Sequence, residues 1–438
     1  MEKLLEMAKK VCDQAEVYSY EPATSSVLFE NAKLHDIESS IHAGVSLRII
    51  KDGKLGFAYT RNILNRNEIL QNALDSLKGK VEAEYDFPLT TEISDLKTFD
   101  PSIEDLTTSR MVDELCRISE QFQSKTDAEI SLDSYKHIEK IMIMNSQGTD
   151  INSKNGGFGF YLGLIFPGGA SSISRSQSYF TFKKTPQNLV NEMIEFYNSS
   201  QKVIEPKSGK MKVLWMPKSM HTLTWRILSG TSAKSIYERI SPIAEKIGKK
   251  IFDEKLTIHD APLDDKYPWT RAFDDEGVNC HPLSIIENGV LKSFYYDLNF
   301  AKKLNTKSTG HGYRTSRWGG EAIGIKPNPN LTHLQIKPGN ASFSELLKFM
   351  DKGMIIEGAM GAHSGNIPNG DYSVGVSPGF YVENGEIIGR VKDAMIAGNV
   401  YDTLKNVIAI EDTLHPSWSG RFPAILCDDV SVATKKYD

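Results

Sequence analysis

The sequence predicts an α+β protein of two domains, because helical and antiparallel patterns occupy separate stretches of the chain. Apolar residues recur at helical spacing in several stretches, whereas Asp-Gly and Asn-Gly turns lie between short apolar runs, which is typical of antiparallel hairpins. A basic segment with Pro and Gly, 202–212, is the predicted boundary. We therefore expect an N-terminal domain, 1–205, of helices with an antiparallel sheet. The C-terminal domain, 206–438, should be β-rich, with antiparallel hairpins or a barrel-like sheet.

The N-terminal half is expected to alternate helices with antiparallel strands. The spacing of Leu4, Leu5 and Ala8 predicts a helix at its start. Asn67 is the expected N-cap of the second helix, and Gly79 is its expected end. In chain order the elements are a first helix at about 4–15, strands 25–28, 45–50 and 55–60, helices 67–78 and 109–124, strands between 127 and 183 with Gly-rich turns at 155–157 and 167–169, and a helix at 188–199.

The C-terminal half is expected to become β-rich after two helices. An apolar strand, 211–215, leads into a helix within 215–230, and a second helix is predicted at 232–249. The stretches 284–293 and 380–389 each contain an apolar strand, an Asn-Gly turn and a returning strand. They are candidates for two equivalent hairpins of one sheet or barrel.

Composition is that of an ordinary soluble globular protein. The chain has 438 residues, of which 40% are hydrophobic and 24% charged, and its formal net charge is -5. This mildly acidic balance provides no basic footprint for a nucleic acid. The N-terminal stretch has acidic residues and no apolar signal-peptide core, and no segment is long and apolar enough to cross a membrane. We therefore expect a cytoplasmic protein with no membrane or nucleic-acid partner.

Four cysteines lie far apart in the sequence, with no CxxC spacing: Cys12, Cys116, Cys280 and Cys427. This spacing favours isolated reduced thiols over a structural zinc site or a disulfide framework. The adjacent pair Cys280-His281 falls in a segment with strand character, so we do not expect it to bind a metal.

Three motifs carry a resemblance to a known family. They are Gly-Asp-Tyr-Ser-Val-Gly-Val-Ser-Pro-Gly-Phe-Tyr-Val-Glu-Asn-Gly-Glu-Ile at 370–387 with Ile-Ala-Gly-Asn at 396–399, Phe-Asp-Asp-Glu-Gly-Val at 273–278 before Ile-Glu-Asn-Gly-Val-Leu at 286–291, and Lys-Ser-Thr-Gly-His-Gly at 307–312. Together they resemble the TldD/TldE (PmbA) family, also called modulators of DNA gyrase, over most of the chain. The resemblance implies two branches. TldD-like members carry an HExxxH zinc helix and a downstream zinc-binding Cys, whereas TldE-like members lack both and pair with a TldD-like partner.

The first helix of the C-terminal half looks like that zinc helix with its chemistry removed. By the resemblance, His221 stands at the first zinc ligand, Thr222 at the general-base Glu and Arg226 at the second His. Thr222 cannot act as a base at neutral pH, and Arg226 would repel a metal ion. The C-terminal loop, 413–423, where the zinc branch has its Cys, contains none, and Cys427 lies beyond it. We therefore interpret the chain as TldE-like, with no catalytic residue and no metal site of its own.

His221 and Arg226 keep two interpretations at this stage. They are either polar positions of an ordinary amphipathic helix or residues that line a groove inherited from the peptidase fold. In the second case, Arg226 would engage a substrate carboxylate or an acidic group of a partner.

Two Gly-rich loops add further cleft candidates. His311, Arg317 and Trp318 are good recognition residues in a loop that either contacts a peptide or partner or lies on the surface without a ligand. His363 belongs to the stretch 360–373, whose Ser and Asp residues are expected to cap a turn rather than form a hydrolase site. By the resemblance, this stretch is a wall of a peptide channel.

The interpretation we favour is a non-catalytic subunit of a heterodimeric metallopeptidase that shapes a cleft for unfolded peptide. Its partner would be a TldD-like chain that carries the zinc, and this chain would hold no cofactor. One alternative is an enzyme in its own right, either a metallopeptidase with non-standard ligands or a hydrolase that uses Ser364 or Ser373. A second alternative is a homodimeric peptide-binding or regulatory protein.

Overall fold

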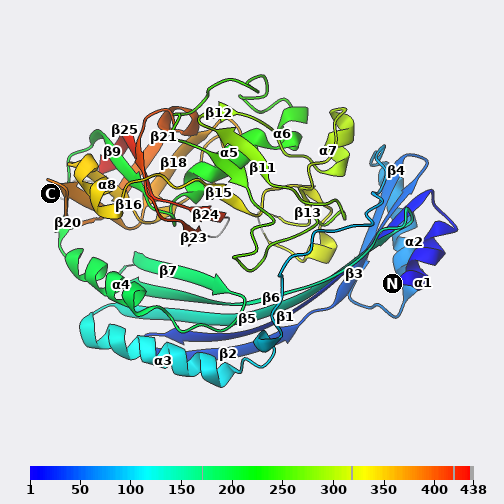
Figure 1. Cartoon of the computed structure of the whole chain (residues 1–438), viewed down its shortest axis with the longest axis horizontal. Coiled ribbons are helices and arrows are strands. Elements are labelled where there is room, and N and C mark those ends of the chain that lie inside the picture. Colours follow the sequence, from blue (N-terminus) through cyan, green and yellow to red (C-terminus); the bar gives the residue numbers. More distant parts are fainter. Residues whose placement is uncertain (170, 317–318, 418–419, 435–438) are drawn as a thin grey trace.

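The computed structural model describes residues 1–169, 171–316, 319–417 and 420–434. A long curved sheet with four helices forms the N-terminal body, and a β-rich C-terminal body lies over it (Figure 1). The predicted α+β class is confirmed. None of the helices in the described ranges is long and apolar enough to cross a membrane.

The N-terminal body is built on an antiparallel seven-stranded sheet in the order β4-β3-β1-β5-β6-β7, with β2 also paired to β1. Three strands of 16 or 17 residues, β1, β5 and β6, run the length of this sheet. The strands are β1 Gln14–Glu30, β2 Lys33–Ile41, β3 Gly44–Lys51, β4 Lys54–Thr60, β5 Glu129–Asn145, β6 Asp150–Ile165 and β7 Ser172–Tyr179. The predicted strands of this half all fall within them.

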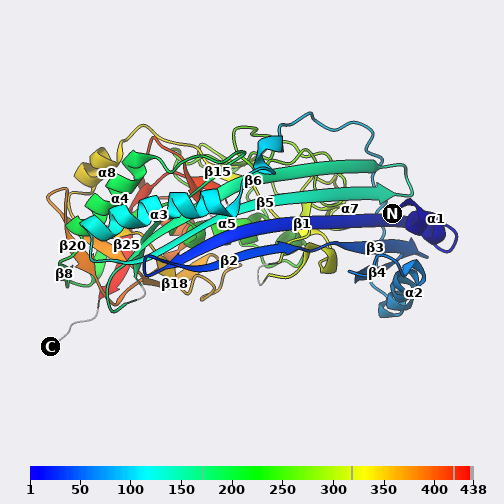
Figure 2. The same ribbon diagram turned by 90° about the horizontal axis from the view of Figure 1, so that it is seen from below.

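Helices cover the sheet at two places. At one end, α1 (Glu2–Lys9) and α2 (Arg66–Ser76) pack their apolar faces on β1, β3 and β4. On the face away from the C-terminal body, α3 (Thr108–Lys125) covers β1 and β5 (Figure 2). The helix α4 (Gln187–Ser199) packs beside α3 and also contacts β7 and β20. The short 3-10 helices η1 (Leu77–Gly79) and η2 (Pro101–Ile103) lie in the connections.

Three local predictions in this half are wrong. The first helix, expected at about 4–15, ends at Lys9, and Ala15 already belongs to β1. The N-cap of α2 is Asn65, whose side chain accepts a hydrogen bond from the backbone N–H of Glu68, and not Asn67. The Gly-rich stretch 155–157 continues β6 instead of forming a turn. A Cβ at Gly156 would lie 2.9 Å from the ring of Phe99, so this glycine serves close packing rather than chain reversal.

The C-terminal body combines a ten-stranded sheet, a six-stranded sheet and a two-stranded ribbon. The large sheet contains β8 Val203–Ile204, β9 Gly209–Trp215, β16 Gly353–Ile356, β17 Ala359–Met360, β18 Asp371–Val376, β19 Gly379–Glu383, β20 Glu386–Val391, β21 Ala394–Asn399, β22 Val407–Ile410 and β25 Ile425–Thr434. The smaller sheets contain β10 Ile258–Asp260, β11 Leu283–Glu287, β12 Val290–Leu291, β15 Leu334–Ile336, β23 His415–Ser417 and β24 Gly420–Phe422, and the pair β13 Gly312–Tyr313 and β14 Asn328–Pro329. Its helices are α5 His221–Thr231, α6 Ala233–Tyr237, α7 Leu298–Lys303, α8 Phe343–Met350, α9 Val400–Thr403 and the 3-10 helix η3 Ala322–Gly324.

The predicted helix at 232–249 is wrong for most of its length. Only α6 is helical there, because Arg239 adopts a left-handed conformation and Pro242 cannot continue a helical hydrogen-bond ladder. Both Asn-Gly hairpins are present, as β11-β12 and β19-β20. They belong to different sheets, so they are not equivalent hairpins of one sheet.

The two bodies share an apolar core. One buried cluster combines residues of the long sheet and α4 with residues of β9, α8 and β19. Phe196 of α4 and Phe380 of β19 place their ring centroids 4.7 Å apart. The boundary at residue 205 stays a prediction, since apolar packing is continuous across it.

Candidate functional site

The helix at the predicted zinc position is α5, which begins at His221 after a short connection from β9. The Nδ1 atom of His221 lies 2.9 Å from the carbonyl oxygen of Lys218. Burial is the main cause that lowers the pKa of His221, and the nearby Arg226 and Lys218 act in the same direction. Thr222 is fully buried, and its hydroxyl has no hydrogen-bond partner within the described part of the chain.

Arg226 lies inside the C-terminal body. The groove interpretation would require its side chain to be exposed on a groove wall. Its side chain is 0% exposed. Nε donates to the carbonyl oxygen of Asp371 at 2.6 Å, and Nη2 donates to that of Ser364 at 2.7 Å. Nη1 donates to the carbonyl oxygens of Thr222 at 2.8 Å and Ala362 at 3.1 Å. One guanidinium therefore ties α5 to the loop between β17 and β18.

The residues around α5 do not fit a zinc ion. The helix supplies one imidazole, and a guanidinium occupies the position where the resemblance implies a second. Over residues 1–434 without the gaps given above, no three His, Cys, Asp or Glu side chains are grouped as metal ligands. A protein zinc site needs at least three such ligands.

His311 is a buried residue rather than a surface contact. Its Nδ1 atom lies 2.9 Å from the hydroxyl of Thr309, and its Nε2 atom lies 3.4 Å from Oδ2 of Asp260. Both His311 and Asp260 are 0% exposed. The other two candidates of this loop, Arg317 and Trp318, lie outside the described residues.

His363 and Ser364 are exposed on the loop that Arg226 holds. Asp371, at the end of this loop, accepts a hydrogen bond at Oδ1 from Asn399 at 2.8 Å. Ser373 is also exposed, on β18. The structure therefore brings Arg226 into contact with the backbone of this loop. His311 instead lies just before β13, against Asp260 of β10.

Sequence reasoning missed a buried charge network that joins the two bodies. Arg48 of β3 donates to Glu16 of β1 at 2.8 and 2.6 Å and to Glu276 at 2.9 Å. Arg314 donates to Glu16 at 3.0 Å, and its backbone N–H donates to Asp275 at 2.7 Å. The motif at 273–278, together with Arg314 just after the motif at 307–312, thus positions charges against the long sheet. The partners are 228 and 298 residues apart in sequence, so local spacing contains no signal for them.

A second cluster lies at the start of α5, where β9 and β16 end side by side as parallel strands. Glu357, directly after β16, is fully buried and accepts a hydrogen bond from Arg175 of β7. Lys218, just after β9, donates to the carbonyl oxygen of Ser172 at 3.3 Å. Ser417 of the C-terminal loop donates to the carbonyl oxygen of Pro217 at 3.1 Å. The C-terminal loop, where the zinc branch would have its Cys, therefore lies beside the start of α5.

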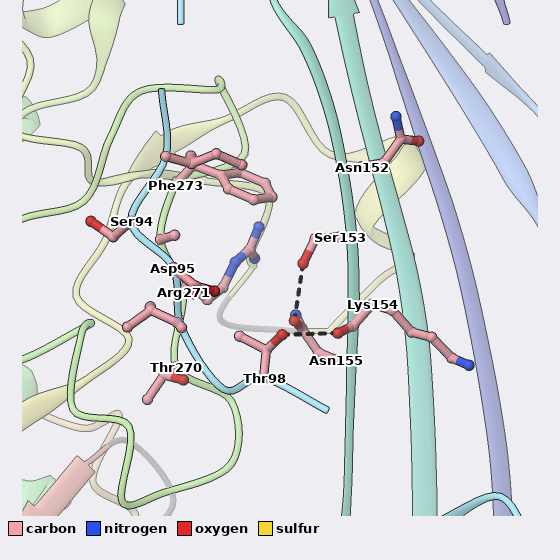
Figure 3. Close-up of a pocket in the computed structure, with 13 residues that line it drawn as sticks. Ser94, Asp95, Thr98, Asn152, Ser153, Lys154, Asn155, Thr270, Arg271 and Phe273 are labelled. Carbon is pink, nitrogen blue, oxygen red and sulfur yellow. Dashed lines mark hydrogen bonds between the residues drawn. The ribbon is translucent and has the colours of Figure 1, made fainter. Parts of the chain in front are cut away.

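A polar cavity of about 220 Å³ lies elsewhere, between β6 and the segment 270–273 (Figure 3). Thr98 donates to the carbonyl oxygen of Lys154 at 2.9 Å, and Ser153 donates to Asn155 at 3.1 Å. Arg271 projects into the cavity and is neutralised by Asp275 at 2.7 Å. The polar groups around the cavity therefore bond mainly to neighbouring protein groups. No residue of α5 lines the cavity.

Comparison with known proteins identifies related chains. A family model described as the PmbA/TldA metallopeptidase C-terminal domain matches residues 208–434. A second model, described as PmbA/TldA metallopeptidase domain 1, matches residues 15–83. An uncharacterized protein of Methanocaldococcus jannaschii is 26% identical over 94% of this chain and 95% of its own length. A metalloprotease of Methanothermobacter thermautotrophicus is 25% identical over 90% of this chain and 87% of its own.

Two solved structures have the same fold over nearly the whole chain. The crystal structure of a candidate modulator of a DNA gyrase from Thermotoga maritima has a TM-score of 0.87 and 27% identity, with 99% of both chains covered. The crystal structure of TldE from Thermococcus kodakarensis has a TM-score of 0.89 and 23% identity, again with 99% of both chains covered.

Proposed function

The chain belongs to the PmbA/TldD family of metallopeptidases and their relatives, and we propose that it is a TldE-like subunit without zinc. In this proposal it pairs with a zinc-bearing TldD-like chain, and the two together enclose a cleft for unfolded peptide. This chain shapes the cleft and positions the substrate, while the partner carries out the metal-dependent chemistry.

The observation that carries the proposal is the environment of Arg226. Its guanidinium is a permanent cation, fixed by four backbone carbonyl oxygens at the helical position where a zinc peptidase has its second His. A metal ion beside it would experience charge repulsion and would lack a third ligand. Thr222, in the place of the general base, has a hydroxyl that stays protonated at neutral pH.

The loop architecture around α5 supports the same proposal. Ser417 donates a hydrogen bond to the carbonyl oxygen of Pro217, just before α5, which supports an arrangement of helix and C-terminal loop like the one that the resemblance implies for the zinc branch. A chain that keeps this shape and lacks the ligands is suited to binding and positioning rather than to hydrolysis.

The test is co-expression with the zinc-bearing relative encoded in the same genome. We expect the two chains to copurify, and we expect cleavage of an unfolded peptide by the pair but not by this chain alone. Elemental analysis of the purified chain should find no stoichiometric zinc. About one zinc per chain, lost in His221→Ala, would overturn the proposal and favour an enzyme with non-standard ligands. A stable homodimer that binds peptide and does not associate with the zinc-bearing chain would favour the regulatory alternative.

A further inference from the structure

The cavity of Figure 3 lies where the two bodies meet. Its wall combines residues between 93 and 98 and residues 152–155, from the N-terminal half of the chain, with residues 270–273 of the C-terminal half. Ser94 and Asp95 are exposed, so the cavity reaches solvent on their side. Its volume of about 220 Å³ is enough for a small organic molecule rather than a single water. A ligand in this cavity would therefore contact both bodies.

Two adjacent residues of the cavity wall have unused hydrogen-bonding groups. The side chain of Arg271 projects into the cavity, and in the described part of the chain its guanidinium makes one hydrogen bond, from Nη2 to Asp275 at 2.7 Å. Thr270 is 1% exposed, and its hydroxyl has no hydrogen-bond partner among the described residues. Buried polar groups are nearly always bonded, so these donors indicate a ligand with an oxygen acceptor. A carboxylate is the acceptor that a guanidinium binds best.

The charges behind Arg271 do not match a simple anion. Burial opposes the charge of this side chain, but Asp275 and Glu139 more than offset it and raise the pKa of Arg271. Its positive charge is therefore already balanced by protein carboxylates. A ligand that brings a carboxylate to this place should also bring a positive group, so that it adds no net negative charge.

Asp95 supplies a partner for such a positive group. It lies on the open side of the cavity, and in the described ranges it forms no ion pair, since the nearby Lys97 pairs with Asp100 at 3.2 Å. The wall also has an apolar part, which includes Leu96 and the buried ring of Phe273. The cavity thus offers a donor pair, a free carboxylate and an apolar surface.

We propose that this cavity binds a free α-amino acid with an apolar side chain. The carboxylate of the ligand accepts hydrogen bonds from Arg271 and Thr270, and its ammonium group pairs with Asp95. The apolar side chain of the ligand packs against Leu96 and Phe273. No residue of α5 lines the cavity, so this is a small-molecule site separate from the proposed peptide cleft. Because the wall comes from both halves of the chain, the bound amino acid links the two bodies and stabilises their packing.

The first test compares L-leucine with two analogues by isothermal titration calorimetry on the purified chain. L-leucinamide lacks the carboxylate and should bind at least about tenfold more weakly, because it loses the charge-assisted bonds to the guanidinium. 4-Methylpentanoate lacks the ammonium group and should bind about threefold more weakly, since Asp95 is exposed and its ion pair is weak. L-leucine should also raise the melting temperature. Equal affinities of L-leucine and L-leucinamide, or no rise in melting temperature at about 10 mM L-leucine, would overturn the site.

The second test assigns the ammonium partner. Asp95→Asn changes an exposed side chain, so the fold should be retained, which circular dichroism checks. The variant should bind L-leucine about threefold more weakly and should no longer distinguish it from 4-methylpentanoate. Asp36→Asn, at an exposed carboxylate of β2 that does not line the cavity, should bind as the unaltered chain does. An undiminished preference for L-leucine in Asp95→Asn would overturn the assignment of Asp95.

The third test uses the unpartnered hydroxyl. Thr270→Val preserves the shape of the side chain and removes a hydroxyl that has no partner within the described ranges, so the ligand-free chain should be as stable as before. Its affinity for L-leucine should fall up to about tenfold, the effect of one hydrogen bond. Thr185→Val removes an equally buried and unpartnered hydroxyl elsewhere and should leave the affinity unchanged. Unchanged binding by Thr270→Val, or equal losses in both variants, would show that Thr270 does not contact the ligand.

Discussion

Two sites of this molecule bury arginine side chains, and they neutralise the buried positive charge in different ways. Arg226 is neutralised by backbone carbonyl dipoles within one body, whereas Arg48 and Arg314 are neutralised by carboxylates that connect two bodies. The first site fixes one loop to one helix. The second is an ion network in which loss of one member leaves other charges buried and unpaired. The comparison indicates that Arg226 is a local clamp beside α5 and that the inter-body network links the two bodies.

The largest effect is therefore expected from the network. Glu16→Ala removes a fully buried carboxylate that pairs with both Arg48 and Arg314, and it should lower the free energy of unfolding by about 3–5 kcal/mol. Urea denaturation measures this change. Glu21→Ala on the same strand removes the partner of the exposed Lys140 and should change stability little. Equal destabilisation by the two variants would contradict a special role for the network.

Sequence patterns predicted much of the fold because the signals are local. Apolar periodicity identified α3 and α4 to within one residue at each end, and the Asp-Gly turn located the β3-β4 hairpin. The lengths of β1, β5 and β6 were not predicted, because long strands that alternate polar and apolar residues lack clear ends and because Gly156 has the composition of a turn. A glycine is present at position 156 because the ring of Phe99 packs against the strand there, and this tertiary contact is not visible in the local sequence.

Only part of the candidate site could be predicted from the sequence, because the contacts that bury its residues are also tertiary. The pattern of His221, Thr222 and Arg226 leads to the proposal of a chain without zinc chemistry, but the exposure of each side chain cannot be read from the sequence of one helix. Arg226 and His311 are both fully buried, although their residue types are typical of binding surfaces. The partners that bury them come from segments distant in sequence.

A smaller effect is expected from the local clamp. Arg226→Met leaves the carbonyl oxygens of Ala362, Ser364 and Asp371 without their donor, and it should lower the free energy of unfolding by about 2–3 kcal/mol. Limited proteolysis should then cut the loop 361–370 sooner than in the unaltered chain. Arg226→Lys should recover only part of the loss, because an ammonium cannot span carbonyls on three sides of a planar guanidinium. If proteolysis instead begins between the two bodies, the clamp is not local.

An effect that is absent in acid and appears only as the pH rises is expected from Asp297, which lies beside the network and caps α7. Its Oδ1 atom accepts a hydrogen bond from the backbone N–H of Phe300 at 2.7 Å. Burial, together with the charge of Glu276, raises the pKa of Asp297 to about 8. The folded chain therefore holds a proton that the unfolded chain releases near pH 4, so this contribution to stability is complete below that pH and is lost as the pH rises through about 8.

Asp297→Asn keeps the cap and resembles the protonated acid. The variant should match the unaltered chain below about pH 4, exceed its stability increasingly between pH 4 and about pH 8, and keep a constant advantage above that, with a slope difference of up to about 1.4 kcal/mol per pH unit within this interval. Urea denaturation at several pH values measures this divergence, with Asp113→Asn on the exposed side of α3 as the control. Parallel curves for Asp297→Asn and the unaltered chain would show that the network does not hold this proton, and the contrast between a titratable inter-body network and a pH-independent clamp at Arg226 would fail.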